Sequence, residues 1–145
     1  MIARVISDPA RAEELAVEVL LKWTRHPSAQ GDQAGAWLYR TAVRMGLDEL
    51  RRQARRDRLD RLLRVFSTSP TPEDLRAVRE EQQQVRAVLR RLRRRHAELL
   101  VLRSHGLRYD EVAAALTLNP ASVGTLLARA QEAFRKEYVK RYGPA

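Results

Sequence analysis

The chain has 145 residues, enough for one ordinary domain or two small helical ones, and it has no cysteine, which excludes a disulfide framework and a thiolate metal site. The net charge is +10, and it is unevenly distributed: residues 1–50 carry six Lys or Arg and seven Asp or Glu, whereas residues 51–145 carry 22 Lys or Arg and 11 Asp or Glu. The basic part is suited to binding a polyanion, and the mildly acidic part is suited to binding a protein partner. No apolar run approaches the ~20 residues of a membrane span and no signal sequence opens the chain, so we expect a cytoplasmic protein without a membrane span.

The first predicted helix begins at Asp8 and Pro9, because Asp is a good N-cap and proline is tolerated at the first helical position. The motif His26-Pro27 ends it, since the residue before a proline disfavours helical backbone. A loop follows over residues 28–33. The predicted core side of this helix consists of Leu15, Val19, Leu20 and Trp23.

A second helix is predicted from about Asp32 or Ala34, with a possible continuation through an arginine-rich segment to Leu62 or Leu63. This segment, RRQARRDRLDRLLR at 51–64, has seven Arg and two Asp. A basic face beside an apolar stripe is what a helix that follows the DNA backbone needs. The alternative is a solvated amphipathic helix that packs through its leucines.

The segment STSPTP at 67–72 is the clear linker of the chain. It divides the sequence into helical modules at 1–66 and 73–145. In the second module, a third helix is predicted to start near Pro72 or Glu73, and Gly106 suits the C-terminal cap of the helix that ends around His105.

A helix-turn-helix without a wing is predicted over residues 107–135, and it completes an all-α fold. The first apolar stripe is interrupted at Thr117–Asn119, and a second helix starts at once because Asn119 is a good N-cap and Pro120 suits the first helical position. A plain αα-hairpin is the alternative. The two stripes contain Val112, Ala113 and Leu116, then Val123, Leu127 and Ala130.

Three segments resemble bacterial sigma factors of the extracytoplasmic-function type. YDEVAAALTLNPASVGTLLARA resembles their region 4, RAEELAVEVLLKW at 11–23 their region 2.2, and AWLYRTAVRMGLDELRR at 36–52 their regions 2.3 and 2.4, which bind and melt the minus-ten promoter element. TPED at 71–74 matches a frequent linker of the family. The resemblance implies a transcription initiation protein whose partners are core RNA polymerase and promoter DNA, with an anti-sigma protein as a further candidate.

The resemblance also implies three sets of binding residues. Polymerase would be bound by Glu13, Glu14 and Glu18. The region 2-like DNA surface would comprise Trp37, Tyr39, Arg44, Arg51, Arg52, Arg55 and Arg56, the two aromatic side chains stacking on unpaired bases and the four arginines from Arg51 onward contacting phosphates. Trp37 is alternatively a core residue. The region 4-like surface would comprise Pro120, Ala121, Ser122, Gly124, Thr125 and Arg129.

The sequence departs from the family pattern at several positions. The start of the chain corresponds only to the end of region 2.1, so either region 2 is incomplete in this protein or the sequence is a fragment. Arg44 replaces the usual Asn of region 2.3. Arg93-Arg94-Arg95 replaces a Pro-containing break between two helices, so a fusion of these two helices into one is an alternative. Thr117 replaces a Gly in the turn, and a β-branched residue there predicts a distorted turn. The usual polar residues of the recognition helix correspond to Gly124, Thr125, Leu126 and Ala128, which predicts weak sequence selection.

The sequence gives no support for an enzyme. The three histidines stand far apart, and there is no phosphate-binding Gly-rich loop and no nucleophile elbow. We therefore expect no catalytic residue, metal or cofactor. The alternatives to a sigma factor are a polymerase-interacting protein that has lost promoter specificity and a stand-alone helix-turn-helix regulator.

Overall fold

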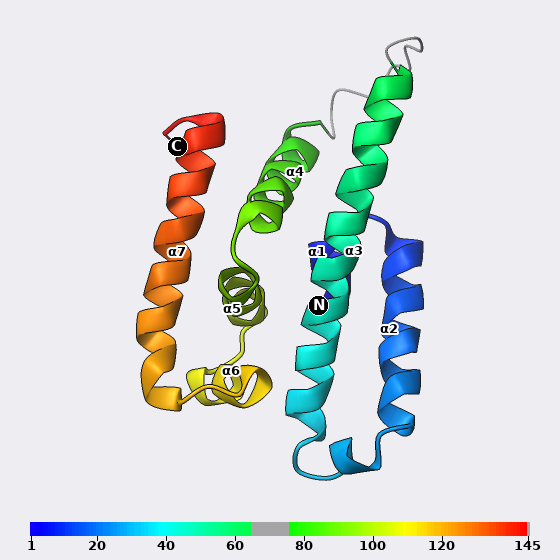
Figure 1. The fold of residues 1–145 in the computed structure, drawn as a ribbon, viewed down its shortest axis with the longest axis vertical. Coiled ribbons are helices and arrows are strands. Elements are labelled where there is room, and N and C mark those ends of the chain that lie inside the picture. Colours follow the sequence, from blue (N-terminus) through cyan, green and yellow to red (C-terminus); the bar gives the residue numbers. More distant parts are fainter. Residues whose placement is uncertain (65–75, 145) are drawn as a thin grey trace.

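The computed structural model describes residues 1–64 and 76–144, here called the N-terminal and C-terminal halves, and the side chains of 57–64 and 76–78 are outside the description. Within these residues the structure is helical without strands, which confirms the all-α prediction (Figure 1). The predicted linker at 67–72 lies outside the described residues. The elements are α1 (Ile2–Val5), α2 (Pro9–Thr24), the 3-10 helix η1 (Pro27–Ala29), α3 (Ala34–Arg64), α4 (Arg76–Arg91), α5 (Arg94–Ser104), α6 (Tyr109–Leu116) and α7 (Pro120–Tyr142).

Helix α2 begins as its sequence predicts. A carboxylate oxygen of Asp8 accepts hydrogen bonds from the backbone N–H groups of Ala10 at 3.1 Å and Arg11 at 3.3 Å, and Pro9 occupies the first turn. One predicted core residue is wrong, because Leu20 is 53% exposed. Leu20 lines an open groove beside Leu38 of α3, while Leu15 and Val19 face inward and are buried.

Helix α3 is the central element of the fold. It runs without interruption from Ala34 to Arg64, so the second predicted helix does continue through the arginine-rich segment. In Figure 1 it lies between α2 on one side and α4, α5 and α6 on the other, with α7 beyond them. Val43, Leu47 and Leu50 are buried, and one apolar cluster runs from α1 and α2 through α3 into the C-terminal half. The two halves therefore share a core.

Helices α4 and α5 are separate, so the fused helix that the sequence left open does not form. The chain turns at Leu92 and Arg93, where Arg93 has extended backbone at φ −55° and ψ 140°. Leu92 is buried at the turn, and Leu99 and Leu102 of α5 are fully buried. A straight continuation of α4 would carry these leucines away from α3 and α7, which α5 contacts, so burial of apolar area favours the break.

The helix-turn-helix forms as predicted between α6 and α7. Asn119 caps α7 by accepting from Ala121 N at 3.0 Å. Thr117 adopts the left-handed conformation at φ 56° and ψ 54°, and Leu118 N donates to Ala113 O at 2.9 Å. The expected distortion of the turn is therefore wrong: the backbone keeps a regular C-terminal cap, and the β-branched residue bears the strain of about 1–2 kcal/mol. All six residues of the two predicted stripes are buried.

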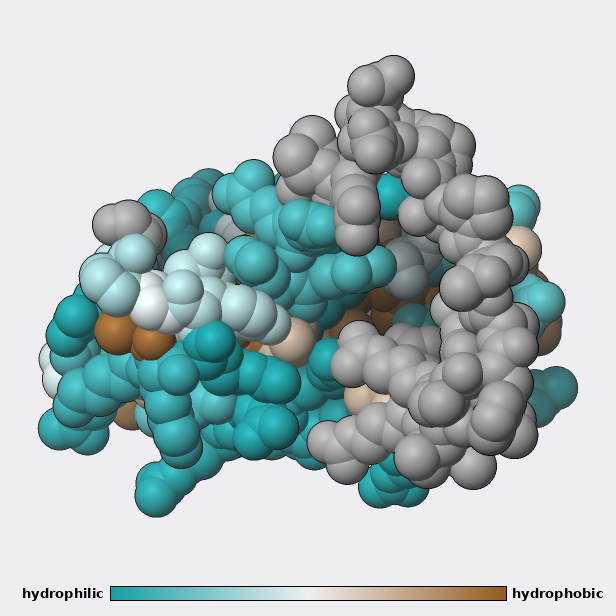
Figure 2. Space-filling model, turned by 90° about the horizontal axis from the view of Figure 1, so that it is seen from above, coloured by the Kyte–Doolittle hydropathy of each residue, from teal (hydrophilic) through white to brown (hydrophobic). Residues whose placement is uncertain are grey.

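The surface of the molecule is mostly hydrophilic. On the face in Figure 2, polar residues predominate and hydrophobic ones show in smaller patches. None of the described helices is long and apolar enough to cross a membrane.

Candidate functional site

The first turns of α7 present the predicted region 4-like surface to solvent. Ser122, Thr125 and Arg129 are exposed, as are Pro120 and Ala121 before them. These are the first turns of the second helix of a helix-turn-helix, the part that enters the major groove in proteins of this architecture. Only the two hydroxyls and the guanidinium can hydrogen-bond to base edges, so the surface offers few polar groups for sequence selection.

Gly124 and the leucines that follow serve packing. A Cβ added at Gly124 would lie 3.4 Å from Cε2 of Tyr109, so this position lets the aromatic ring of α6 approach α7. Leu127 is buried, and Leu126 is half-buried against the core. These contacts leave Arg129 as the exposed cation of the recognition surface.

The two aromatic residues of the region 2-like surface are half-buried. The ring of Trp37 lies 5.3 Å from that of His26, and the ring of Tyr39 meets that of His105 edge-on at 6.4 Å. Both also pack on the apolar core. Stacking on an unpaired base would need these rings to leave their present partners, so the core interpretation of Trp37 gains support.

The arginines of α3 differ in their exposure to solvent and in whether they already form an ion pair. Arg44, Arg55 and Arg56 are exposed, and Arg51 is half-buried. Arg52 is exposed but pairs with Glu49, with 3.3 Å between Nη1 and Oε2. The C-terminal part of the arginine-rich segment, from residue 57, lies outside the described side chains. Of the four arginines expected to contact phosphates, Arg55 and Arg56 are therefore the best placed.

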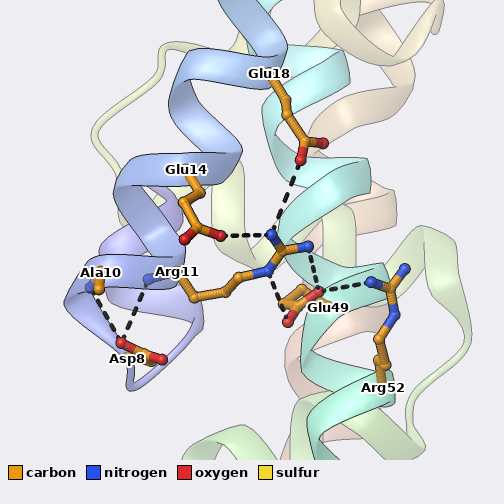
Figure 3. Close-up of polar contacts among 7 residues, drawn as sticks. All are labelled: Asp8, Ala10, Arg11, Glu14, Glu18, Glu49 and Arg52. Carbon is orange, nitrogen blue, oxygen red and sulfur yellow. Dashed lines mark hydrogen bonds and ion pairs between the residues drawn. The ribbon is translucent and has the colours of Figure 1, made fainter.

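Glu49 is the centre of an ion-pair network that joins α2 to α3 (Figure 3). Its side chain is only 2% exposed, and its two oxygens accept from Nε and Nη2 of Arg11 at 3.2 and 3.4 Å. The hydrogen bond to Glu49, followed by the one to Glu14, raises the pKa of Arg11 above its ordinary value. This buried carboxylate was not predicted from the sequence, where Glu49 stands among charged neighbours without distinction. The network fixes the rotation of α2 on α3.

The acidic residues of α2 lie on its outer side. Glu13, Glu14 and Glu18 are exposed, and Glu14 and Glu18 lie 2.8 and 3.9 Å from Nη1 of Arg11. Glu13 lies beside an apolar groove of about 560 Å³ that is also lined by Ala16, Leu20 and Leu38.

An exposed apolar set accompanies these carboxylates. Val17, Leu20 and Leu21 are 50%, 53% and 51% exposed, at helical spacing along α2. A helix that is apolar on its outer as well as its inner side is typical of an element with a second partner. The sequence of α2 contains these residues as a second apolar stripe, but only the structure shows which of the two apolar stripes remains exposed. We call Glu13, Glu14, Glu18, Val17, Leu20 and Leu21 the outer face of α2.

The described part of the chain offers binding surfaces and no metal centre. It contains no group of three His, Asp or Glu side chains that could hold a metal ion. The chemistry it offers consists of an exposed recognition helix, exposed arginines on α3 and an acidic, partly apolar face on α2.

Comparison with known proteins gives a family match for residues 1–56 and a similar fold for both halves. Residues 1–56 match the family model for sigma-70 region 2. Among solved structures, the fold is similar to a co-crystal structure of the sigma factor RpoE with the anti-sigma factor NepR from Bartonella quintana, with a TM-score of 0.53 and 17% identity over 94% of this chain and 86% of that chain. No curated protein matches the chain by sequence.

These matches cover the segments that carried the resemblance in the sequence. The family match includes α2 and the part of α3 up to Arg56, and the structural similarity extends over both halves. Sigma factors are transcription initiation factors and not enzymes, so the expectation of a non-enzymatic protein is confirmed. The resemblance to sigma factors is confirmed as well: residues 1–56 match the model for sigma-70 region 2, and the chain shares the all-α fold of a sigma factor.

Proposed function

We propose that this protein is a transcription initiation factor that binds core RNA polymerase through α2 and promoter DNA through α3 and α7. Its place is then the cytoplasm, where bacterial transcription occurs. The observation that carries the proposal is the outer face of α2: it lies within the sigma-70 region 2 match, and the fold leaves its carboxylates and apolar residues exposed.

The outer face of α2 has the composition of a protein-binding surface. The centre of an interface is typically apolar and gains free energy from the burial of that area, while charged residues at the rim steer association and select the partner. Val17, Leu20 and Leu21 would supply the apolar contact, and Glu13 would favour a basic partner surface.

The DNA side of the proposal rests on α3 and α7. Arg44, Arg55 and Arg56 of α3 are exposed cations that can neutralise phosphates, and α7 offers the exposed N-terminal turns of a recognition helix. The region 2-like residues would act at the minus-ten element, and the helix-turn-helix would act at the minus-thirty-five element.

Co-purification with core RNA polymerase tests the polymerase contact. Reversal of Glu14 or Glu18 would disturb Arg11, which holds the buried Glu49. The variant of choice is therefore Glu13→Lys with Leu21→Ser. Loss of co-purification at unchanged helicity is expected, and Asp32→Lys, an exposed reversal in the loop before α3, serves as the matched control.

A DNA footprint on the co-purified complex separates the alternatives. A protected promoter supports the proposal, whereas polymerase binding without a footprint would identify a polymerase-interacting protein that has lost promoter specificity. A footprint by the chain alone, with no polymerase bound and no effect of the α2 variant, would identify a stand-alone helix-turn-helix regulator.

An anti-sigma protein is a further proposed partner, because the sigma factor of similar fold was crystallised with one. Purification of the chain from its native cell, followed by identification of a stoichiometric partner other than polymerase subunits, tests this partner. A native complex that contains only polymerase would contradict it.

A further inference from the structure

A groove of about 840 Å³ lies between α1 and α4, and none of its lining residues belongs to the surfaces proposed above. One wall consists of α1 and the residues that follow it, and the other wall is one side of α4. The volume is in the range of about 300–1,000 Å³ that is usual for pockets that bind small molecules. The residues that give the groove most of its polar chemistry are Arg4, Ser7, Arg79, Gln82, Gln83 and Arg86.

The wall formed by α4 carries cations and amides in one continuous stripe. Its polar residues occupy positions i, i+3, i+4 and i+7, which share one face of a helix. They are Arg79, Gln82, Gln83 and Arg86. The two arginines are two helical turns apart, about 10 Å, with the two amides between them. Arg4 adds a third cation from the wall formed by α1.

The guanidinium of Arg86 is held in place without a counter-ion among the described residues. Its Nε donates to Val5 O at 3.0 Å and its Nη2 donates to Arg4 O at 3.5 Å, so two backbone oxygens tie it to α1. Both acceptors are neutral. Burial lowers the pKa of Arg86 below its ordinary value, and no carboxylate opposes that effect. A half-buried cation of this kind gains free energy when an anion lies beside it.

The other two arginines of the groove are available to a ligand. Arg4 and Arg79 are exposed, and within the described part of the chain neither forms an ion pair. Arg4 makes a long hydrogen bond, 3.5 Å, from Nη1 to Ser104 O. Among the described lining residues, three guanidinium groups stand against the single carboxylate of Glu81. The groove therefore carries an excess of positive charge.

This arrangement suits a ligand with several phosphate groups. A guanidinium binds phosphate oxygens through parallel hydrogen bonds, which are stronger than those between neutral groups. Arg79 and Arg86 are too far apart for a single phosphate to contact both, whereas a chain of phosphate groups can extend from one to the other. The volume of the groove is that of a small-molecule pocket, so a DNA duplex is not the expected ligand.

We propose that the groove between α1 and α4 binds a small ligand with a chain of phosphate groups, which Arg79 and Arg86 contact from α4 and Arg4 contacts from α1. Two sources share this chemistry, a nucleoside triphosphate and inorganic polyphosphate. The site goes beyond the proposed function and does not depend on it, because no residue assigned to polymerase or promoter binding lines the groove.

Isothermal titration calorimetry of the full chain tests the site, with sodium triphosphate and ATP as probes in magnesium-free buffer. Gln83→Glu places a carboxylate between the two arginines of α4 at nearly unchanged side-chain shape, and Arg79→Gln removes an exposed cation. The matched controls are Gln33→Glu, in the loop before α3, and Arg25→Gln, at the end of α2, both at exposed positions. Each variant has the same net charge as its control, so a difference between them reports the position of the charge.

We expect triphosphate to bind the wild type, to bind Gln83→Glu and Arg79→Gln about tenfold more weakly, and to bind both controls as it binds the wild type. In a titration followed by nuclear magnetic resonance, the backbone amides that shift should be those of residues 3–7 and 79–89. Far-UV circular dichroism establishes that each variant is folded.

The comparison of the two probes identifies the source of the phosphate chain. Tighter binding of ATP than of triphosphate would identify a nucleotide, whose base can cover the apolar part of the groove. Equal binding would identify inorganic polyphosphate. The apolar part consists of Ile6, Val85 and Leu89.

Three results would overturn the proposal. They are the absence of binding by both probes, an equal loss of affinity in Gln83→Glu and Gln33→Glu, and resonance shifts confined to α3 and α7, where the arginines proposed to bind DNA lie. None of these results bears on co-purification with polymerase or on the footprint, so this proposal and the proposed function can fail separately.

Discussion

Replacing Thr117 by glycine should stabilise this protein, an outcome opposite to that of most substitutions. Thr117 is held at φ 56° in the turn of the helix-turn-helix, a conformation that costs a residue with a Cβ about 1–2 kcal/mol. Glycine removes this strain but loses about 0.5–1 kcal/mol through the greater freedom of the unfolded chain. Thr117 is exposed, so little packing is lost. The net gain is then about 0–1.5 kcal/mol, with a middle value just under 1 kcal/mol.

Urea and thermal unfolding followed by circular dichroism measure this gain. For a chain of this length, a gain of about 1 kcal/mol corresponds to a rise in Tm of roughly 3–4 °C. Thr117→Val is the matched control: it is nearly the same shape, remains β-branched and should keep the strain. If Thr117→Gly were no more stable than Thr117→Val, or less stable than the wild type, the turn would not store the strain that its backbone angles indicate.

The remaining predictions concern DNA binding and pH. Arg55→Ala with Arg56→Ala should reduce the slope of log K against log salt by about 1.8, at 0.9 per phosphate contact, in a fluorescence titration with duplex DNA, whereas Arg25→Ala should leave it unchanged. Arg129→Ala should lower affinity for the preferred site and flatten its sequence preference in a selection experiment, and a sharp motif that survives it would place the recognition surface elsewhere. Leu127→Ala should instead cost about 2–5 kcal/mol of folding stability, because the side chain is buried. Burial, then the charges of the N-terminus and Arg4, lower the pKa of His105, so the folded state favours the neutral ring. The unfolded chain then binds the proton more readily, and stability should fall as the pH drops below about 6.5. His105→Gln should remove that part of the pH dependence in urea unfolding, and an unchanged profile would contradict it.

Several features of the fold follow from short stretches of sequence. The starts of α2 and α7 are set by Asp8 and Asn119, whose side chains accept from N–H groups two or three residues ahead. The buried stripes of α6 and α7 follow from helical spacing alone. The sigma-factor resemblance was also visible in short segments, because the exposed residues of such a surface are specified by type and spacing.

Other features depend on residues that are distant in sequence. The sequence shows two apolar stripes on α2, but only packing against α3 decides that Leu15 is inside and Leu20 outside. The break between α4 and α5 follows from the leucines that α5 buries between α3 and α7. Thr117 can remain left-handed because α6 and α7 are both held by a shared core.

The candidate site shows the same division between local and distant interactions. Type and spacing were enough to predict that Arg129 and Glu13 are exposed, as the structure has them, and their part in binding stays a prediction. No local pattern distinguishes Arg40 of α3 from the other arginines, since the backbone oxygen to which its Nε donates, that of Ala115 in α6, lies 75 positions away. Nor does any local pattern mark Glu49, whose partner Arg11 is 38 positions away. The sequence by itself determined where most helices begin and which types of side chain they carry, because these depend on neighbours within a few residues. Only the tertiary structure decided which charged side chains join one helix to another and which remain exposed to solvent.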